Sequence, residues 1–184
     1  MIYQDHAIKG WMSQACLEWL YQQAGKMRTI VEIGTYRGRS AHALASGCRG
    51  PINCVDPWPT TRKGQVWSVD KWAGNAKYQE DGEEIYQDAK KNLAEFDNLT
   101  LLRMTSLQAS RQFQDASIDM VFIDGQHSYE NVTQDISLWL PKAAKLLCGH
   151  DYSPSWPGVQ QAVQERFPGR FQVIRGGSIW YVWL

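Results

Sequence analysis

The stretch from Asp119 to Asp151 decides the fold that we expect for this chain. It begins with DMVFIDGQHSY (residues 119–129) and, after an amphipathic run, ends within KLLCGHDY (residues 145–152). Each apolar run is typical of a buried strand, and each is followed by an acid with a histidine close by. Parallel strands deliver the polar residues that follow them to one rim of a sheet, where open α/β folds bind ligands. The candidate reaction centre therefore consists of Asp124, His127, His150 and Asp151.

Outward from this stretch, apolar runs of strand length alternate with amphipathic segments of helical spacing. The strand-like runs fall at 29–33, 52–55, 99–104, 118–123, 145–148, 171–174 and 178–184. The helical segments fall at 8–20, 40–46, 83–96, 129–140 and 158–167. This alternation predicts an α/β fold with a Rossmann-like, doubly wound and mostly parallel seven-stranded sheet. A glycine turn joins the last two runs, so we expect a C-terminal antiparallel hairpin.

Composition limits the classes of partner. The chain has 184 residues, of which 43% are hydrophobic, and its acidic and basic residues are equal in number. The length predicts a single domain over residues 1–184. Zero net charge argues for a small-molecule partner, with no nucleic acid and no membrane. A homo-oligomer is compatible with the sequence. Dispersed cysteines and an N-terminus without an export signal predict reduced thiols and a cytoplasmic location.

A loop after the first predicted strand is the second candidate site. The sequence VEIGTYRGRS (residues 31–40) places two glycines between a strand and a helix, which lets a ligand approach the backbone at a helix N-terminus. Asp56 ends the next strand, where an acid can accept hydrogen bonds from ribose hydroxyls. The alternative is an ordinary turn in which the glycines serve only steric needs.

This loop and Asp56 resemble the first two motifs of the class I S-adenosylmethionine-dependent methyltransferases, in which an acid and glycines follow strand one and an acid follows strand two. Glu32 agrees with the resemblance, because its carboxylate would repel a pyrophosphate but suits the amino group and the positive sulfonium of S-adenosyl-L-methionine. The resemblance implies that this molecule is the cofactor, with its adenine near the residues after strand three. The implied cofactor-binding residues are Glu32, Gly34, Thr35, Tyr36, Gly38, Ser40, Asp56, Trp58, Thr105, Ser106 and Asp124.

The reaction centre is similar to one branch of this class, the small methyltransferases like macrocin O-methyltransferase and the cephalosporin hydroxylase-like proteins. The similarity rests on IDGQHSY (residues 123–129), on Asp135 and Trp139, and on GHDY (residues 149–152). It implies a divalent cation, magnesium, manganese or another, and a histidine base. The implied cation ligands are Asp124 and Asp151, with His150 as the third.

The chain departs from the branch at two places, of which the first bears on the implied cation and the second on a loop more than on the chemistry. Some metal-dependent members have Glu where this chain has His150, and imidazole suits zinc, iron or nickel better than magnesium. The run KAAK (residues 142–145) replaces a Pro-Gly-Gly turn before strand five. For His150 and Asp151, hydrogen bonding to nearby backbone groups is the alternative to metal binding.

His127 is the predicted general base for methylation of a hydroxyl. A hydroxyl is a poor nucleophile at neutral pH, so a base has to take its proton, and imidazole titrates in the required range. A cation bound to the hydroxyl would lower its pKa and orient it. The alternative for His127 is a surface histidine at a helix N-terminus.

The sequence thus predicts an S-adenosylmethionine-dependent methyltransferase that transfers a methyl group to an oxygen of a small molecule such as a sugar, a polyol or a natural product. The alternatives are an N-methyltransferase and a protein that binds S-adenosylmethionine or a nucleoside without transfer. The aromatic-rich segment 58–79 is the one long irregular stretch, and we expect an insertion or lid there.

Overall fold

We describe the fold from a computed structural model of the chain. The structure describes residues 3–4, 7–58, 67–68 and 79–184. The predicted lid at 58–79 therefore lies mostly outside the described residues. Within it, β3 (Trp67–Ser68) and β4 (Gln79–Glu80) pair as two short antiparallel strands.

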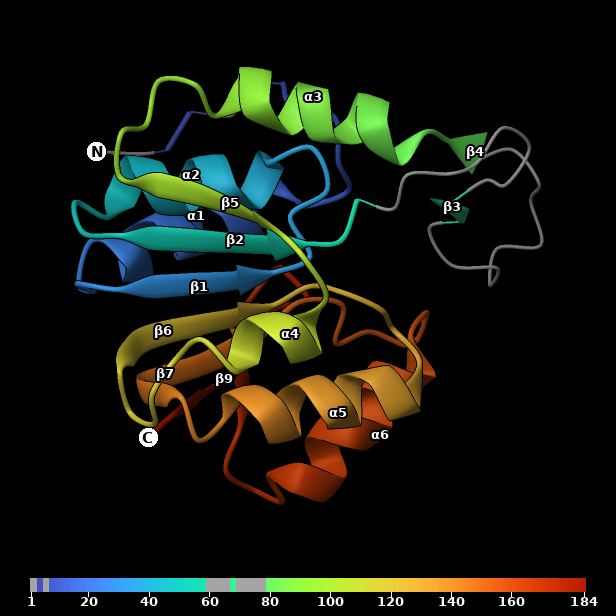
Figure 1. The fold of residues 1–184 in the computed structure, drawn as a ribbon. Helices are drawn as coiled ribbons and strands as arrows, with labels where there is room; N and C mark the ends of the chain where they lie inside the picture. The colour runs from blue at the N-terminus through green and yellow to red at the C-terminus, as the bar shows by residue number, and fades with distance from the viewer. Residues whose placement is uncertain (1–2, 5–6, 59–66, 69–78) are drawn as a thin grey trace.

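The strands of the main sheet confirm the predicted topology. Their order across the sheet is β5-β2-β1-β6-β7-β9-β8. The pairs from β5 to β7 are parallel, and β9 runs antiparallel to both β7 and β8. The sheet is thus mostly parallel, with antiparallel strands at its C-terminal edge (Figure 1). The bounds are β1 Ile30–Ile33, β2 Ile52–Asp56, β5 Leu99–Arg103, β6 Ile118–Ile123, β7 Ala143–Gly149, β8 Gln172–Val173 and β9 Trp180–Trp183.

The helices cover the two faces of this sheet. In Figure 1, α1, α2 and α3 lie on one side of the strands and α4, α5 and α6 on the other. Side chains follow the same division because successive residues of a strand point to opposite faces. In β6, Met120 and Phe122 pack with α1 and α2, whereas Val121 and Ile123 pack with α5 and α6. The bounds are α1 Gln14–Ala24, α2 Arg39–Gly47, α3 Gly82–Asn92, α4 Ser106–Ser110, α5 Tyr129–Trp139 and α6 Pro157–Arg166.

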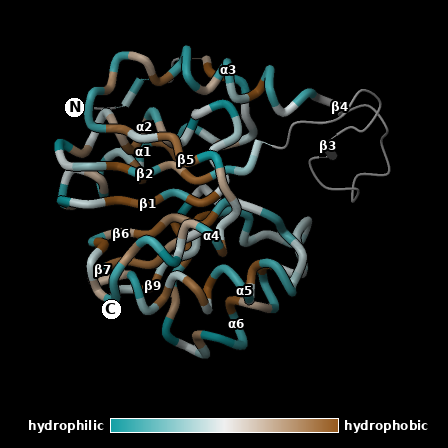
Figure 2. Tube along the Cα trace, in the orientation of Figure 1, coloured by the Kyte–Doolittle hydropathy of each residue, from teal (hydrophilic) through white to brown (hydrophobic). Residues whose placement is uncertain are grey.

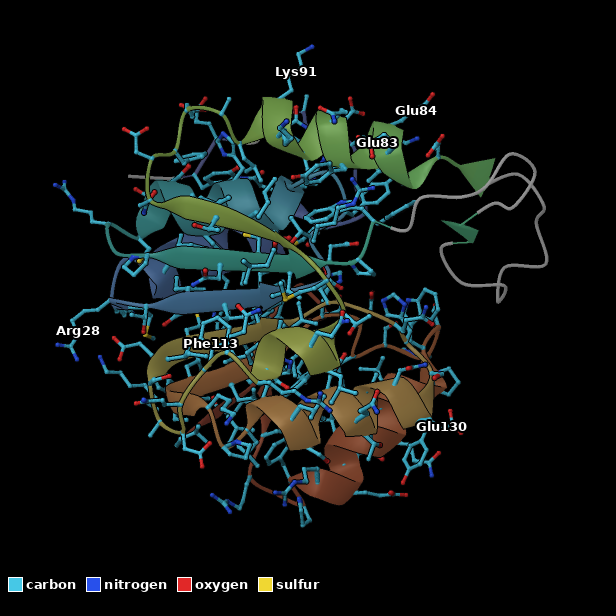
Figure 3. The ribbon with its side chains drawn as sticks, viewed as in Figure 1. Arg28, Glu83, Glu84, Lys91, Phe113 and Glu130 are labelled. Carbon is cyan, nitrogen blue, oxygen red and sulfur yellow. The ribbon has the colours of Figure 1, made fainter. Side chains whose placement is uncertain are left out.

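A polar side chain caps the start of α5, and charged side chains lie on the outer faces of the helices. Ser128 caps α5 by accepting a hydrogen bond from the backbone of Asn131, which starts that helix directly after the loop from β6. Charged side chains such as Glu84, Lys91 and Glu130 project from the outer faces of α3 and α5 (Figure 3). Hydrophobic residues instead concentrate along the central strands (Figure 2).

The N-terminal helix differs from the prediction. A helix over residues 8–20 is wrong, because α1 starts at Gln14 and ends at Ala24. Ser13 accepts a hydrogen bond from the backbone N–H of Cys16, so the helix begins there. The residues before it are held away from helical geometry, since the Arg39 guanidinium donates a hydrogen bond to the carbonyl of Ile8 (2.6 Å).

Sequence patterning also missed α4, whose single turn is too short to show periodicity. Thr105 and Gln108 form a capping box around its first turn. All four cysteines are free and buried, as expected. Among the described residues, no helix has the length and apolar character needed to cross a membrane.

Candidate active site

A pocket of about 390 Å³ lies where the strands β1, β2, β6 and β7 end. Ligand sites of open α/β sheets occupy this edge, and the volume falls within the usual range for small-molecule sites. Its wall brings together most of the residues predicted from the sequence, namely Gly34, Thr35, Tyr36, Ser40, Asp56, Thr105, Ser106, Asp124, His127, His150 and Asp151. Three predicted residues, Glu32, Gly38 and Trp58, do not line it.

Gly34 permits the close approach of the β1 and β6 loops. Its φ is +87°, and a Cβ at this position would overlap the backbone carbonyl of Asp124. Only glycine fits both the conformation and the space. The backbone N–H of Gly34 also donates to the carbonyl of Val55 (2.8 Å), which ties the loop to β2.

Asp56 organises the glycine loop through its carboxylate. Its Oδ2 accepts hydrogen bonds from the backbone N–H groups of Thr35 (3.1 Å) and Tyr36 (2.9 Å), and its Oδ1 accepts one from Trp58 (2.9 Å). Burial raises the pKa of Asp56, and these three hydrogen bonds oppose that rise. The carboxylate therefore shapes the loop while remaining on the pocket wall.

Glu32 is placed differently from the sequence prediction. It is fully buried, and its Oε1 accepts a hydrogen bond from the hydroxyl of Ser40 (2.5 Å). Burial raises the pKa of Glu32 to about 7, although hydrogen bonds from Ser40 and Thr35 oppose the rise. Glu32 is not among the residues that line the pocket, and its expected contact with a positive ligand group stays a prediction. Glu32 instead holds Ser40 at the start of α2.

Gly38 and Trp58 also act from behind the wall. Gly38 precedes α2 with a φ of +90° and packs against Leu93. Trp58 is 1% exposed, and its indole N–H donates to the backbone carbonyl of Tyr36 (2.8 Å). Both residues support the loop that lines the pocket, and their expected contact with a cofactor stays a prediction.

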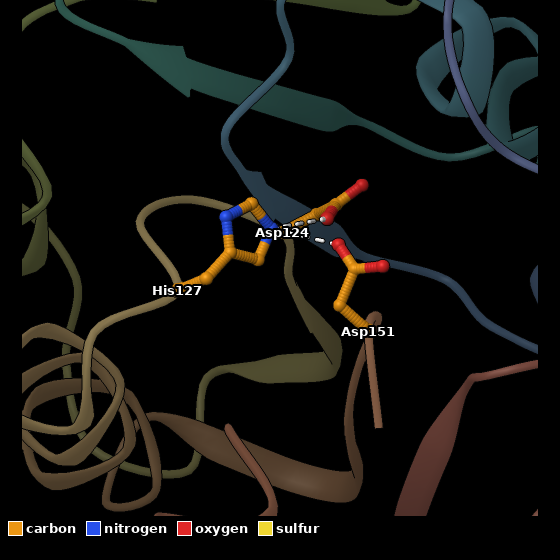
Figure 4. Close-up of side chains that lie close together, drawn as sticks. All are labelled: Asp124, His127 and Asp151. Atoms are coloured by element: carbon orange, nitrogen blue, oxygen red, sulfur yellow. Dashed lines mark ion pairs between the residues drawn. The ribbon is translucent and has the colours of Figure 1, made fainter. Parts of the chain in front are cut away.

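The reacting end of the pocket joins His127 to two acids (Figure 4). Its Nε2 lies 2.7 Å from Asp151 Oδ2 and 4.0 Å from Asp124 Oδ1. The imidazole stacks on the indole of Trp156, with 4.1 Å between the ring centroids and 26° between the planes. The stack fixes the plane of the imidazole, and Asp151 fixes its direction. Asp151 itself has a φ of +60°, a left-handed conformation that an aspartate tolerates.

His150 interacts with the same acids from a more buried position. Its Nδ1 lies 3.2 Å from Asp151 Oδ2 and 3.6 Å from Asp124 Oδ1, and its Nε2 lies 3.0 Å from the hydroxyl of Ser178. Burial alone would lower the pKa of His150, but the carboxylates of Asp124 and Asp151 outweigh it and raise the pKa to about 12. The raised pKa makes His150 a positively charged partner of both acids, and its expected role as a third cation ligand stays a prediction.

The group that suits a cation contains His127 in place of His150. The ligand atoms of Asp124, His127 and Asp151 all lie within 4.8 Å of one another. Burial would raise the pKa of Asp151, but hydrogen bonds from His127 and His150 lower it below the usual range, so the carboxylate is charged. Two carboxylates and one imidazole form a donor set that divalent transition metals accept.

Two aromatic residues of the site were missed by the sequence reasoning. Trp11 lines the pocket although it is 58% exposed, and its ring lies 5.2 Å from that of Tyr36. It lies in the non-helical segment before α1, which helical spacing did not predict. Trp156 does not line the pocket but stacks on His127, and this contact joins two loops and has no sequence period.

Solved structures with this fold are similar over nearly the whole chain. The O-methyltransferase from Bacillus cereus, solved in complex with SAH, matches with a TM-score of 0.61 at 18% identity and covers 98% of this chain and 84% of its own. TomG from Streptomyces achromogenes, an O-methyltransferase of tomaymycin synthesis solved with SAM, matches with a TM-score of 0.64 at 16% identity, covering 94% and 81%. At these identities the likeness establishes the fold.

Sequence comparison leads to the same group of proteins. An uncharacterized Sinorhizobium fredii protein, y4gI, is 31% identical over 129 residues, which is 67% of this chain and 13% of that protein. The chain thus spans a small part of that relative's length. Residues 31–152 match the family described as "Methyltransferase domain". The matched residues hold both the glycine loop and the His127 cluster, so the chain belongs to the methyltransferase domain family.

Proposed function

We propose that the protein transfers a methyl group from S-adenosyl-L-methionine to a hydroxyl oxygen of a small molecule, with His127 as the general base. One observation carries the proposal. A single pocket contains the glycine loop organised by Asp56 and, at its other end, the His127–Asp151 pair. The first feature suits a nucleoside and the second suits removal of a proton. Together they match methyl transfer to oxygen.

The cofactor would supply an electrophilic methyl group carried on a positive sulfur. The carboxylates of Asp56, Asp124 and Asp151 line the pocket and favour a ligand with positive charge. Gly34 lets the β1 loop and the β6 loop approach each other, and both loops line the pocket that would hold such a ligand. The bound SAM and SAH named for the Streptomyces and Bacillus proteins support the same cofactor here.

His127 is suited to take the acceptor's proton because its ring is held on two sides. Asp151 accepts from the imidazole or stabilises its protonated form, and Trp156 restricts its rotation. Holding a base in one orientation improves proton transfer, since the base must lie within hydrogen-bond reach of the acceptor hydroxyl. Alignment of the acceptor oxygen with the methyl carbon would supply much of the remaining rate.

A divalent cation fits the group of Asp124, His127 and Asp151, and it would lower the pKa of a bound hydroxyl. The nitrogen that faces this group is Nε2 of His127. One lone pair cannot bind a cation and accept a proton at the same time. The roles of His127 as base and as ligand are thus alternatives, and manganese binding distinguishes them.

The acceptor would enter beside Trp11 and Tyr36, which form an aromatic part of the wall. Aromatic faces pack against the C–H faces of sugars as well as against flat rings. This supports a sugar, a polyol or a hydroxylated natural product as acceptor.

Calorimetry with S-adenosylhomocysteine, followed by a methyl-transfer assay on panels of hydroxylated small molecules and of amines, tests the function. We expect binding and the release of S-adenosylhomocysteine with a hydroxylated acceptor. Transfer confined to amines would favour N-methylation. Binding without turnover on any acceptor would favour a cofactor-binding protein, and no binding at millimolar ligand would contradict the proposal.

A further inference from the structure

Two bulky residues at the pocket have a left-handed backbone. Tyr36, which lines the pocket, has a φ of +50°, and Trp58, which follows the pocket residues Asp56 and Pro57, has a φ of +34°. Such angles cost free energy for residues with large side chains, and they persist only where the surrounding structure holds them. The groups that hold Tyr36 and Trp58 therefore determine the shape of this part of the wall.

Hydrogen bonds join these two residues to Asp56 and to each other. The Asp56 carboxylate accepts from the backbone N–H groups of both residues (2.9 Å each), and the indole N–H of Trp58 donates to the carbonyl of Tyr36 (2.8 Å). The remaining polar group of Trp58 is its backbone carbonyl, which accepts a hydrogen bond from Nη2 of Arg103 (2.8 Å). Arg103 thus completes the set of hydrogen bonds that hold Trp58 in place.

The Arg103 guanidinium is itself fixed on other sides. Arg103 ends β5 beside Asp56 in the sheet register, and its Nη1 donates to Glu83 in the first turn of α3 (2.8 Å). The guanidinium carbon lies 4.6 Å from the centroid of the Tyr86 ring. A planar guanidinium has donors in fixed directions, so it can hold a carboxylate and a carbonyl at the same time. Arg103 does not line the pocket, and it can act on a ligand only through Trp58.

We propose that Arg103 is a positioning residue for ligand binding, because its hydrogen bond to the carbonyl of Trp58 keeps Trp58 and Tyr36 in the left-handed conformations that shape the pocket wall. The inference rests on the proposed function, which places the cofactor beside Asp56. Without Arg103, the two residues would relax toward ordinary backbone angles in part of the molecules. Only the remaining molecules would have the native wall, and the apparent affinity falls by that fraction.

Calorimetry with S-adenosylhomocysteine is the first test. Arg103→Met keeps an unbranched side chain against Tyr86 but cannot donate, and its affinity should fall roughly tenfold, the usual effect of losing a hydrogen bond from a charged group. Arg103→Lys keeps the charge beside Glu83 but lacks the fixed second donor, so its affinity should lie between those of the parent and Arg103→Met.

Lys142→Met is the matched control for these variants. Lys142 pairs with an exposed carboxylate, that of Asp115, at 2.7 Å, much as Arg103 pairs with Glu83 at 2.8 Å. The two cations are similarly exposed, at 21% for the Lys142 side chain and 29% for that of Arg103. Lys142 does not line the pocket, so Lys142→Met should keep the parent's affinity for S-adenosylhomocysteine.

Hydrogen exchange followed by NMR separates positioning from a general loss of stability. Without ligand, Arg103→Met should speed the exchange of the backbone N–H groups of Tyr36 and Trp58, because the segments that carry them open locally. The backbone N–H of Arg28 is the internal control, since it also donates to a carboxylate, that of Asp119 (2.8 Å). Arg28 lies at the opposite edge of the sheet (Figure 3), and its N–H should exchange as in the parent.

Parental affinity in Arg103→Met, or unchanged exchange at Tyr36 and Trp58, would overturn the inference alone. Exchange that is faster by the same factor at Arg28 would mean a general loss of stability and would also overturn it. If Arg103→Met does not fold, Arg103→Lys decides by the same two measurements, with smaller changes in the same direction. A parent protein that does not bind S-adenosylhomocysteine would overturn the proposed function, and with it the role of Arg103 in binding.

Discussion

His127 and Asp151 form an ion pair of 2.7 Å across two loops, one after β6 and one after β7. The pair turns Nε2 of His127 toward the acids, and Trp156 holds the ring plane by stacking on it. A neutral imidazole has one lone pair. If Nε2–H donates to Asp151, Nδ1 is the basic nitrogen, and if Nε2 binds a cation, Nδ1 carries the hydrogen and cannot act as the base. The first two predictions separate those roles.

His127→Gln should keep its affinity for S-adenosylhomocysteine but transfer methyl groups more slowly, by about a hundredfold or more, the usual contribution of a general base. Glutamine retains a hydrogen bond to Asp151 but cannot accept the proton. The parent's rate should also fall in acid, because protonated imidazole cannot act as a base. Single-turnover kinetics on the parent and the variant measure both effects.

His42→Gln is the histidine control. His42 lies away from the pocket and interacts with Glu95 (3.2 Å) and Tyr3 (2.8 Å), so its loss should affect stability while the rate per folded molecule stays unchanged. A His127→Gln variant with the parental rate would remove His127 from the chemistry and leave a cation-activated hydroxyl, or an acceptor that needs no base.

Manganese should bind the parent protein, and Asp124→Asn or Asp151→Asn should weaken that binding at least about tenfold, because each removes a charged ligand. Paramagnetic resonance of free manganese measures the binding. Asp115→Asn is the control, because Asp115 is exposed and pairs with Lys142 away from the pocket. If His127→Gln also weakens it, His127 is a ligand and not the base. Activity that does not change with a chelator, combined with no manganese binding, would leave the acids as partners of His127 and His150 alone.

Asp56→Ala should weaken S-adenosylhomocysteine binding and lower the free energy of unfolding by roughly 1 to 3 kcal/mol, the cost of leaving buried donors unpaired. Three backbone N–H groups lose their acceptor in this variant. Asp56→Asn keeps one acceptor oxygen, so it should lose less affinity for S-adenosylhomocysteine and less free energy of unfolding than Asp56→Ala. Calorimetry and urea unfolding measure the two effects, and parental affinity in Asp56→Ala would refute the assignment.

Glu32 should make stability depend on pH. Burial raises its folded-state pKa from 4.5 to about 7, so between these values the native state holds a proton that the unfolded state has lost. The free energy of unfolding then falls as pH rises through this window. Glu32→Gln should remove this part of the dependence and be more stable than the parent at pH ~8 by on the order of 1 to 3 kcal/mol.

Urea unfolding of both proteins between pH ~5 and ~8 tests this prediction. Glu130→Gln removes a carboxylate from the exposed first turn of α5 and serves as the control, since it should leave the parent's pH dependence in place. A Glu32→Gln variant with the parent's dependence would show that Glu32 titrates alike in both states.

Local patterns along the chain were enough to predict the strands, their alternation with helices and the acids that follow them. These features are local: a buried strand is an apolar run such as 118–123, and the residue after it must lie at the rim of the sheet. The pocket therefore contains Asp56, Asp124, His127 and Asp151 as the spacing predicted.

Tertiary structure alone decided where several side chains point. Glu32 lies in β1. The alternation of side chains along the strand turns its carboxylate to the hydroxyl of Ser40 and not into the pocket. The segment before α1 is not helical, and Arg39 donates a hydrogen bond to the carbonyl of Ile8 within it. Trp156 reaches His127 by a contact between separate loops. Such contacts join residues that are far apart in the sequence and follow no periodic pattern. The sequence pattern therefore cannot predict them, and the packing of the folded chain determines them.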